Sequence, residues 1–250
     1  MPRLSDLTAI VTGGASGFGR GICEAYIAEG ANVVIADLDE AKGTDTASQL
    51  GENAVFVKTD VTVSADIDRM ATVAIEAFGG VDIMVNNAGY THPNKPVLDV
   101  TEGEFDRIYD VNVKALFLTT KAIVPIMEKR GGGVIITTAS TAGVRPRPGL
   151  TWYNGSKGAA ITLTKSLAAE LAPLNIRVNA INPVIGETGM LEQFMGQPDT
   201  PENREKFVKT IPLGRMSRPA DIANAAVFFA DPQSAFVTGV AMEVDGGRCV

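Results

Sequence analysis

Short apolar runs rich in β-branched residues alternate with longer stretches of helical periodicity along the whole chain. The short runs predict buried strands, which fall at residues 7–12, 32–37, 54–58, 81–85, 134–138, 176–181 and 240–244. The longer stretches predict helices at residues 17–29, 40–50, 64–78, 101–129, 157–171 and 219–230. Such alternation is typical of an α/β fold whose parallel strands are joined by right-handed crossovers. We therefore expect the functional groups at the carboxyl ends of the strands.

Three segments depart from this simple pattern. Residues 184–212 lose strong periodicity, which at this length is typical of a lid over a binding site with short helices of its own. Residues 90–100 predict a polar loop in which His92 is solvated rather than a base. The long helix that carries Asn112 near its middle is expected to break or kink at Pro125, because proline removes a helical hydrogen bond. An asparagine in the middle of a helix usually has no special role and points to solvent or bonds locally.

Length and charge narrow the class of protein. The chain of 250 residues is suited to one large domain over residues 1–250. Its net charge of −7 and isoelectric point near 4.9 argue against nucleic acid or an anionic membrane as main partner. No apolar stretch approaches the roughly 20 residues of a membrane span, and no signal-peptide segment is recognisable. We expect a cytoplasmic protein.

The cysteine and histidine content gives no indication of a disulfide or a metal site. Cys23 falls within a predicted helix and Cys249 lies one residue from the end, so we do not expect them to pair. A single histidine without a Cys/His cluster makes a zinc site unexpected.

A glycine-rich turn links the first strand to the first helix. Gly13, Gly17 and Gly19 follow the spacing Gly-x-x-x-Gly-x-Gly, which lets backbone N–H groups and a helix N-terminus approach a pyrophosphate. Glycine-rich turns between strand and helix also occur where no ligand binds. The turn alone therefore indicates a candidate dinucleotide site.

The second strand ends at Asp37, whose carboxylate is suited to accept hydrogen bonds from adenosine ribose hydroxyls and would repel a 2′-phosphate. Neither Ser16 nor Leu38 supplies a positive charge for such a phosphate. An aspartate can also simply end a strand as a turn residue. Together with the glycine turn, Asp37 favours NAD over NADP as cofactor.

A second candidate site follows the strand at residues 134–138. Ser140 lies just past that strand, and Tyr153 and Lys157 fall near the start of the next helix. Positions four apart share a helix face, so the ammonium is expected to pull the tyrosine pKa from roughly 10 towards neutrality. Such a base suits proton abstraction from an alcohol, with the serine hydroxyl donating to the substrate oxygen. The same tyrosine–lysine spacing is also common in helices without any chemical role.

Taken together, these motifs resemble the short-chain dehydrogenase/reductase family, in the same order and across essentially the whole chain. The resemblance rests on the glycine turn at residues 12–19, the Asn-Asn-Ala-Gly turn at residues 86–89 and the residues Asn112, Ser140, Tyr153 and Lys157. Where the family carries Pro-Gly after a late strand, this chain has Pro183-Val184, with Gly186 two residues later. The resemblance implies a single-domain Rossmann-type doubly wound parallel sheet with helices on both faces.

The resemblance also implies roles for individual residues. Tyr153 would be the base in alcohol oxidation and the acid in ketone reduction, and Lys157 would lower its pKa and bind the nicotinamide ribose. Ser140 would polarise the substrate oxygen, and Asn112 would hold a water that links the lysine to solvent. The implied cofactor-binding residues are Gly13, Ser16, Gly17, Phe18, Gly19, Asp37, Leu38, Asp60, Val61, Asn87, Ala88, Gly89, Tyr153, Lys157, Pro183, Ile185 and Thr188.

The leading hypothesis is an NAD-dependent dehydrogenase acting on a small or medium secondary alcohol, diol or polyol. One alternative is a 3-oxoacyl-[acyl-carrier-protein] reductase, against which Asp37 and the negative net charge argue. The other is a dinucleotide-binding protein with an inactive site. The resemblance implies a homotetramer or homodimer, with helices at residues 101–129 and 151–172 as candidate interfaces.

Arg145 and Arg147 lie in the loop between Ser140 and Tyr153, so at least one is a candidate for contact with substrate. Each precedes a proline, which holds the arginine backbone extended. A guanidinium beside a water-poor pocket is suited to clamp a carboxylate, sulfonate or phosphate. The alternative is that both side chains are solvated or pair with acids of a neighbouring subunit.

Overall fold

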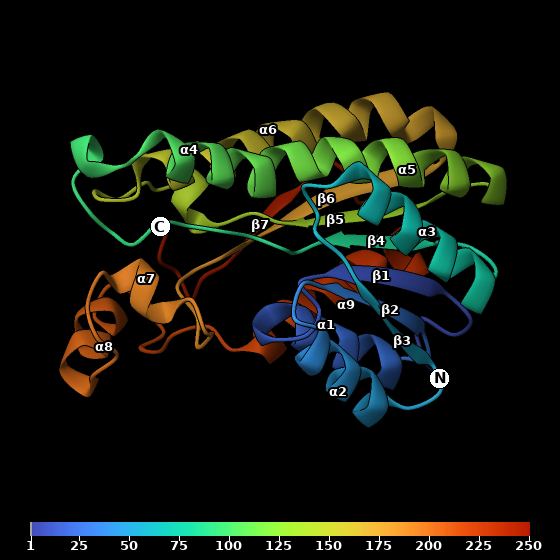
Figure 1. Ribbon diagram of the computed structural model, residues 1–250, viewed down its shortest axis with the longest axis horizontal. Helices are drawn as coiled ribbons and strands as arrows, with labels where there is room; N and C mark the ends of the chain where they lie inside the picture. The colour runs from blue at the N-terminus through green and yellow to red at the C-terminus, as the bar shows by residue number, and fades with distance from the viewer. Residues whose placement is uncertain (1) are drawn as a thin grey trace.

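The computed structural model describes residues 2–250 (Figure 1). Within them, seven parallel strands form one sheet in the order β3-β2-β1-β4-β5-β6-β7. The strands are β1 (Thr8–Thr12), β2 (Asn32–Asp37), β3 (Ala54–Lys58), β4 (Ile83–Asn86), β5 (Gly133–Thr138), β6 (Ile176–Pro183) and β7 (Ala241–Val244). The α-helices are α1 (Gly17–Ala28), α2 (Glu40–Leu50), α3 (Ser64–Phe78), α4 (Glu102–Tyr109), α5 (Ala115–Arg130), α6 (Thr151–Leu171), α7 (Leu191–Met195), α8 (Pro201–Val208) and α9 (Pro219–Ala230).

Helices cover both faces of the sheet, as the sequence predicts. Figure 1 shows α1, α2 and α9 on one side and α3, α4, α5 and α6 on the other. The strands are therefore apolar on both faces, which is why they read as continuous rather than alternating hydrophobic runs. Ile22, Tyr26 and Phe229 are fully buried in the first layer, and Met70 and Ile123 in the second. The expected α/β fold is confirmed.

The order of the strands places a crevice at the centre of the sheet. From β1 the chain proceeds outward to β2 and β3, and from β4 it proceeds the other way to β5, β6 and β7. The crossover connections next to β1 and β4 therefore diverge, and ligands of open parallel sheets bind outside the carboxyl ends of the strands at such a point. The loops after β1, β4, β5 and β6 meet there.

The helix predicted over residues 101–129 differs from expectation. It consists of α4, a π-helical turn at Asp110–Lys114 and α5, and it continues through Pro125. Of the predicted break or kink at Pro125, the break does not occur. Both Pro125 and Lys121, whose carbonyl would accept the missing bond, are exposed, so water can satisfy that carbonyl.

Residues 184–212 contain the short helices α7 and α8, as predicted. They stand apart from the sheet at one end of the molecule (Figure 1) and bury a small apolar cluster that includes Leu191, Met195 and Met216. No helix in residues 2–250 combines the length and apolarity that crossing a membrane requires.

Candidate active site

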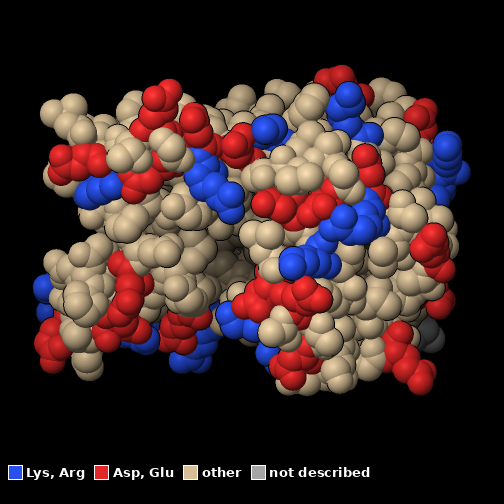
Figure 2. Space-filling view, in the orientation of Figure 1, with Lys and Arg blue, Asp and Glu red and all other residues tan. Residues whose placement is uncertain are grey.

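A pocket of about 700 Å³ opens at the carboxyl ends of the strands. Figure 2 shows the corresponding hollow near the middle of one face, with charged side chains around its rim. Its walls come from the ends of β1, β2, β4, β5 and β6 and from the segment at residues 184–212. Every site residue expected from the sequence lines the pocket except Gly19 and Asn112, which lie directly behind the lining.

The glycine turn has the shape that a pyrophosphate requires. Gly13 and Gly17 have φ angles of +63° and +54°, which side chains rarely allow. A Cβ on Gly19 would lie 2.1 Å from the Gly13 carbonyl oxygen, so the turn can close only around a glycine. Ser16 caps α1 without a side-chain hydrogen bond, which leaves the first N–H groups of the helix free for an anion.

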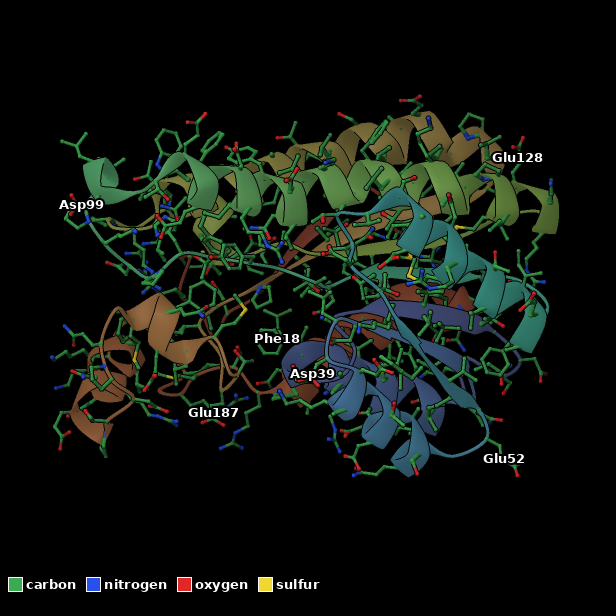
Figure 3. All side chains as sticks on the ribbon, in the orientation of Figure 1. Phe18, Asp39, Glu52, Asp99, Glu128 and Glu187 are labelled. Atoms are coloured by element: carbon green, nitrogen blue, oxygen red, sulfur yellow. The ribbon has the colours of Figure 1, made fainter. Side chains whose placement is uncertain are left out.

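The segment after β6 lies against this turn. The Phe18 ring, labelled in Figure 3, packs at Gly186, where a Cβ would come within 2.4 Å of its Cζ. A Cβ on Gly17 would in turn meet the Thr188 methyl group at 3.3 Å. Val184, which replaces the family glycine, is buried and has no positive φ, so this turn does not need a glycine there.

The pocket lining includes two carboxylates, from Asp37 and Asp60. Each Asp37 oxygen accepts one backbone N–H, from Ala15 and Asp39, both at 3.0 Å. These bonds fix the carboxylate and leave a further lone pair on each oxygen for hydroxyl donors. With Leu38 half exposed at the same wall, the residues fit an adenosine with a free 2′-hydroxyl.

Asn87 fixes the turn after β4 against the glycine turn. Its Nδ2 donates to the Thr12 carbonyl at 2.9 Å, and its backbone N–H donates to the Thr12 hydroxyl at 3.0 Å. The next residue, Ala88, donates to the same hydroxyl at 3.0 Å. The two loops that bracket the crevice therefore form one rigid floor, a structural role that sequence reasoning did not assign.

Asn112 occupies the π-helical turn and is buried. Its Oδ1 accepts the Tyr90 N–H and its Nδ2 donates to the Tyr90 carbonyl, both at 2.9 Å. Nδ2 also donates to the Ser156 hydroxyl at 2.9 Å. Asn112 therefore does not show the usual behaviour of a mid-helix asparagine, because a π-turn projects it onto a loop 22 residues away in sequence.

Tyr153 and Lys157 are both buried at the start of α6, with the lysine Nζ 5.8 Å from the centre of the tyrosine ring. That Nζ donates to the Thr138 carbonyl at 2.8 Å. A Cβ on Gly89 would lie 3.5 Å from the lysine Nζ and 3.6 Å from the Asn112 Oδ1, so these groups surround one small space.

The predicted fall of the Tyr153 pKa towards neutrality is wrong for this structure. Burial raises the pKa of Tyr153 to about 12, against a hydrogen bond with Ser140 and the charge of Arg147, which both lower it. Burial also lowers the pKa of Lys157 to about 8, so this ammonium group loses its proton much more readily than that of an exposed lysine. Desolvation of the phenolate therefore outweighs the stabilisation that the nearby ammonium group was expected to give it, because both side chains are buried.

This burial predicts a pH-dependent stability difference between the parent and Lys157→Met. The lysine titrates at about 8 when folded and 10.5 when unfolded, so between these values the unfolded chain binds more protons. The parent is therefore expected to gain stability relative to the variant as pH rises, by on the order of 1–2 kcal/mol. Urea unfolding of both proteins at about pH 7 and about pH 9.5 measures this. A difference that stays constant or reverses would contradict it.

His92 is fully buried, so the expectation of a solvated residue is wrong. Its Nδ1 lies 2.7 Å from the Pro93 carbonyl oxygen and must donate there. The loop is held inward because Asn94 N–H donates to the Gln193 carbonyl and Lys95 N–H to the Gly149 carbonyl. His92 does not line the pocket.

The two candidate arginines have different environments. Arg145 is exposed and donates to the Arg248 carbonyl, whereas Arg147 is half-buried and donates to the Phe194 carbonyl at 2.8 Å. Both line the pocket, together with Arg248. Sequence reasoning missed Arg248, since nothing in the last residues of the chain marks it.

Cys23 is buried and Cys249 half-buried, and the two are not bonded to each other. In residues 2–250 there is no group of three or more His, Cys, Asp or Glu side chains arranged to hold a metal ion.

The chain is similar to known proteins over nearly its whole length. Residues 13–248 match a family model described as enoyl-(acyl carrier protein) reductase. The chain is 50% identical to 4-formylbenzenesulfonate dehydrogenase TsaC1/TsaC2 of Comamonas testosteroni, over 98% of this chain and 99% of that protein. It is 39% identical to galactitol 2-dehydrogenase of Agrobacterium fabrum, over 98% of each. A solved structure of 3-ketoacyl-(acyl-carrier-protein) reductase from Brucella melitensis, complexed with NADH, is 43% identical with a TM-score of 0.94, over 99% of this chain and 100% of that chain.

Proposed function

The chain belongs to the short-chain dehydrogenase/reductase family, and from this premise we propose that it is an NAD-dependent dehydrogenase interconverting a secondary alcohol and its ketone. Membership makes it an oxidoreductase that uses a nicotinamide dinucleotide. The observation that carries the proposal is the enclosure of Ser140, Tyr153 and Lys157 in the pocket whose other end holds the glycine turn and Asp37. Formation of NADH with a panel of alcohols, diols and polyols tests it; no NADH from any of them would refute it.

The proposed reaction converts an alcohol and NAD⁺ into a ketone, NADH and a proton. Ser140 donates to the substrate oxygen, and Tyr153 takes the hydroxyl proton as the hydride leaves the carbon. Lys157 exchanges protons near neutral pH because its pKa is lowered to about 8, which suits it to pass the proton onward. The bound dinucleotide supplies the hydride acceptor. Asn112, held by Tyr90 at the inner wall, is proposed to position a water beside the lysine.

A preference for NAD over NADP is part of the proposal and rests on Asp37. The NADH complex of the similar Brucella melitensis protein supports it. In Asp37→Ala, the ratio of kcat/KM for NAD over NADP is expected to fall by roughly 10-fold or more, as for the loss of a hydrogen bond to a charged group. Equal kcat/KM for the two cofactors in the parent would contradict the preference.

Asp39→Ala is the matched control for this prediction. It removes the same charge two residues away, where the carboxylate accepts the Lys42 N–H at the start of α2 and lies outside the pocket. Its cofactor ratio should stay close to that of the parent. If the cofactor ratio fell similarly in both variants, the preference for NAD would come from the overall negative charge of this region and not from hydrogen bonds to Asp37.

The second candidate function is reduction of a 3-oxoacyl thioester, favoured by the named activity of the Brucella melitensis protein. The net charge of −7 argues against an acidic carrier protein as substrate. Oxidation of NADH by a 3-oxoacyl thioester at a higher kcat/KM than by any simple ketone would favour this alternative.

We further propose that residues 1–250 act as one domain, with residues 184–212 covering the substrate. A homodimer or homotetramer through α4–α5 and α6 is also proposed. The exposed Phe117 side chain on α5 supports an interface there.

A further inference from the structure

The pocket is lined by more basic than acidic side chains. Its acidic residues are Asp37, the last residue of β2, and Asp60, which lies just after β3. Its basic residues are Arg107, Arg145, Arg147, Lys157, Lys206 and Arg248. Within residues 2–250, none of these six forms an ion pair, although many other lysines and arginines of the chain do. In the part of the chain that the structure describes, an acidic protein therefore lines its pocket with basic side chains that have no acidic partner.

Arg147 is half-buried, whereas Arg107 and Arg145 are exposed. Its guanidinium lies over the Phe207 ring, 5.1 Å from the ring centre, and donates one hydrogen bond to the Phe194 carbonyl. A guanidinium has five N–H donors in a planar fork, and the described residues give this one no second acceptor. Burial and the nearby charge of Arg248 lower the pKa of Arg147, whereas the charge of an ionised Tyr153 would raise it. The guanidinium of Arg147 is therefore close enough to interact electrostatically with both Arg248 and Tyr153.

The wall between Arg147 and Tyr153 is aromatic and apolar. The Phe194 ring meets the Tyr153 ring edge-on, with centres 5.2 Å apart, while its backbone carbonyl holds Arg147. Met190 and Met195, from the same segment as Phe194, also line the pocket. Such walls suit a flat, apolar body, since aromatic pairs at these distances are favourable.

A half-buried cation without a counter-ion is costly, because desolvation penalises the charge. An incoming anion offsets that cost and fills the free side of the guanidinium fork. We propose that Arg147, supported by Arg248, binds a sulfonate or carboxylate on the substrate, separated by an aromatic ring from the carbinol carbon that Tyr153 serves. This inference rests on the proposed function and names the class of substrate for the same site.

The similar Comamonas testosteroni protein gives independent support, since its named substrate combines a benzene ring with a sulfonate. In the proposed reaction the anion takes no part in the chemistry. Racemic 4-(1-hydroxyethyl)benzenesulfonate and NAD⁺ would give 4-acetylbenzenesulfonate, NADH and a proton. The hydride comes from the carbinol carbon and the proton from its hydroxyl group.

The test compares this sulfonate with the neutral 1-phenylethanol. We expect the parent to prefer the sulfonate, and Arg147→Met to reduce the ratio of the two kcat/KM values by roughly 10-fold or more. Arg147→Lys, which keeps the charge but not the fork, should recover part of the ratio. Arg145→Met removes the same charge from the exposed neighbour in the same loop, so its ratio should change much less. A parent without preference, or equal losses in Arg147→Met and Arg145→Met, would overturn the inference.

A binding measurement separates this inference from the proposed function. Calorimetric titration of the NADH-loaded parent with benzenesulfonate should show saturable binding, which benzyl alcohol should not match and which Arg147→Met should weaken roughly 10-fold. Binding without turnover of any alcohol would refute the proposed function and leave the anion site standing. Turnover of neutral alcohols with no binding of benzenesulfonate would refute the anion site alone. The circular dichroism spectrum of each variant shows whether a loss reflects misfolding.

Discussion

Tyr153→Phe is expected to lower kcat for alcohol oxidation by a factor on the order of 10²–10⁴ while the protein keeps its fold and its affinity for NADH. The phenylalanine preserves the ring that packs against Phe194 and removes only the hydroxyl that carries the proton. Because burial raises the pKa of Tyr153 to about 12, the ionised fraction grows with pH, and the parent's oxidation rate should rise across the neutral and alkaline range. The variant should lose this rise.

Steady-state kinetics with the best alcohol of the panel, together with NADH fluorescence titration, measures both effects. Tyr90→Phe is the matched control, because it removes a hydroxyl from another tyrosine that lines the pocket. If Tyr153→Phe kept most of the parent's kcat, or if the two variants lost activity equally, the assignment of the proton to Tyr153 would be wrong.

The second large effect is expected at Gly19. Alanine there would place its Cβ 2.1 Å from the Gly13 carbonyl oxygen and 2.5 Å from Asn87 Nδ2. Neither atom can move freely, because the Asn87 side chain holds the two loops together. We expect Gly19→Ala to weaken NADH binding by a factor on the order of 100 or more and to destabilise the fold by about 2–4 kcal/mol.

Gly103→Ala is the control, since Gly103 also lies in the first turns of a helix but a Cβ there meets nothing within 4 Å. It should stabilise the protein slightly, by about 0.5–1 kcal/mol, and leave NADH binding as in the parent. Urea unfolding of both variants measures the change in stability, and titration with NADH measures the change in affinity. Unchanged NADH affinity in Gly19→Ala would show that the turn can widen without loss.

The fold was predictable from sequence because parallel strands covered on both faces must be apolar along their length. The strand at residues 134–138 and the helix at residues 219–230 were recognisable from their own residues for this reason. The glycine turn was recognisable as well, since its special φ angles restrict the residue type at Gly13 and Gly17.

The environment of individual polar residues was not predictable in this way. Sequence spacing indicated that Lys157 and Tyr153 are neighbours, but their pKa shifts depend on how completely the surrounding elements enclose them. His92 lies in a segment that reads as an exposed loop, yet it is fully buried, and Asn94 and Lys95 hold the segment against α7 and the loop before α6. That Arg147 has no acidic partner among residues 2–250 likewise depends on residues far away in the chain, and no local sequence pattern indicates it.

The π-helical turn at Asp110–Lys114 has a consequence for helical phase. A regular helix advances about 100° per residue, so a wider turn shifts α5 around its axis relative to α4. α5 can then keep Ile123 and Met127 in the core while Asn112 faces the Tyr90 loop. Deleting one residue here would restore a uniform helix and force a choice between these two orientations. The turn thus lets one continuous rod serve the packing of the sheet and the inner wall of the pocket independently.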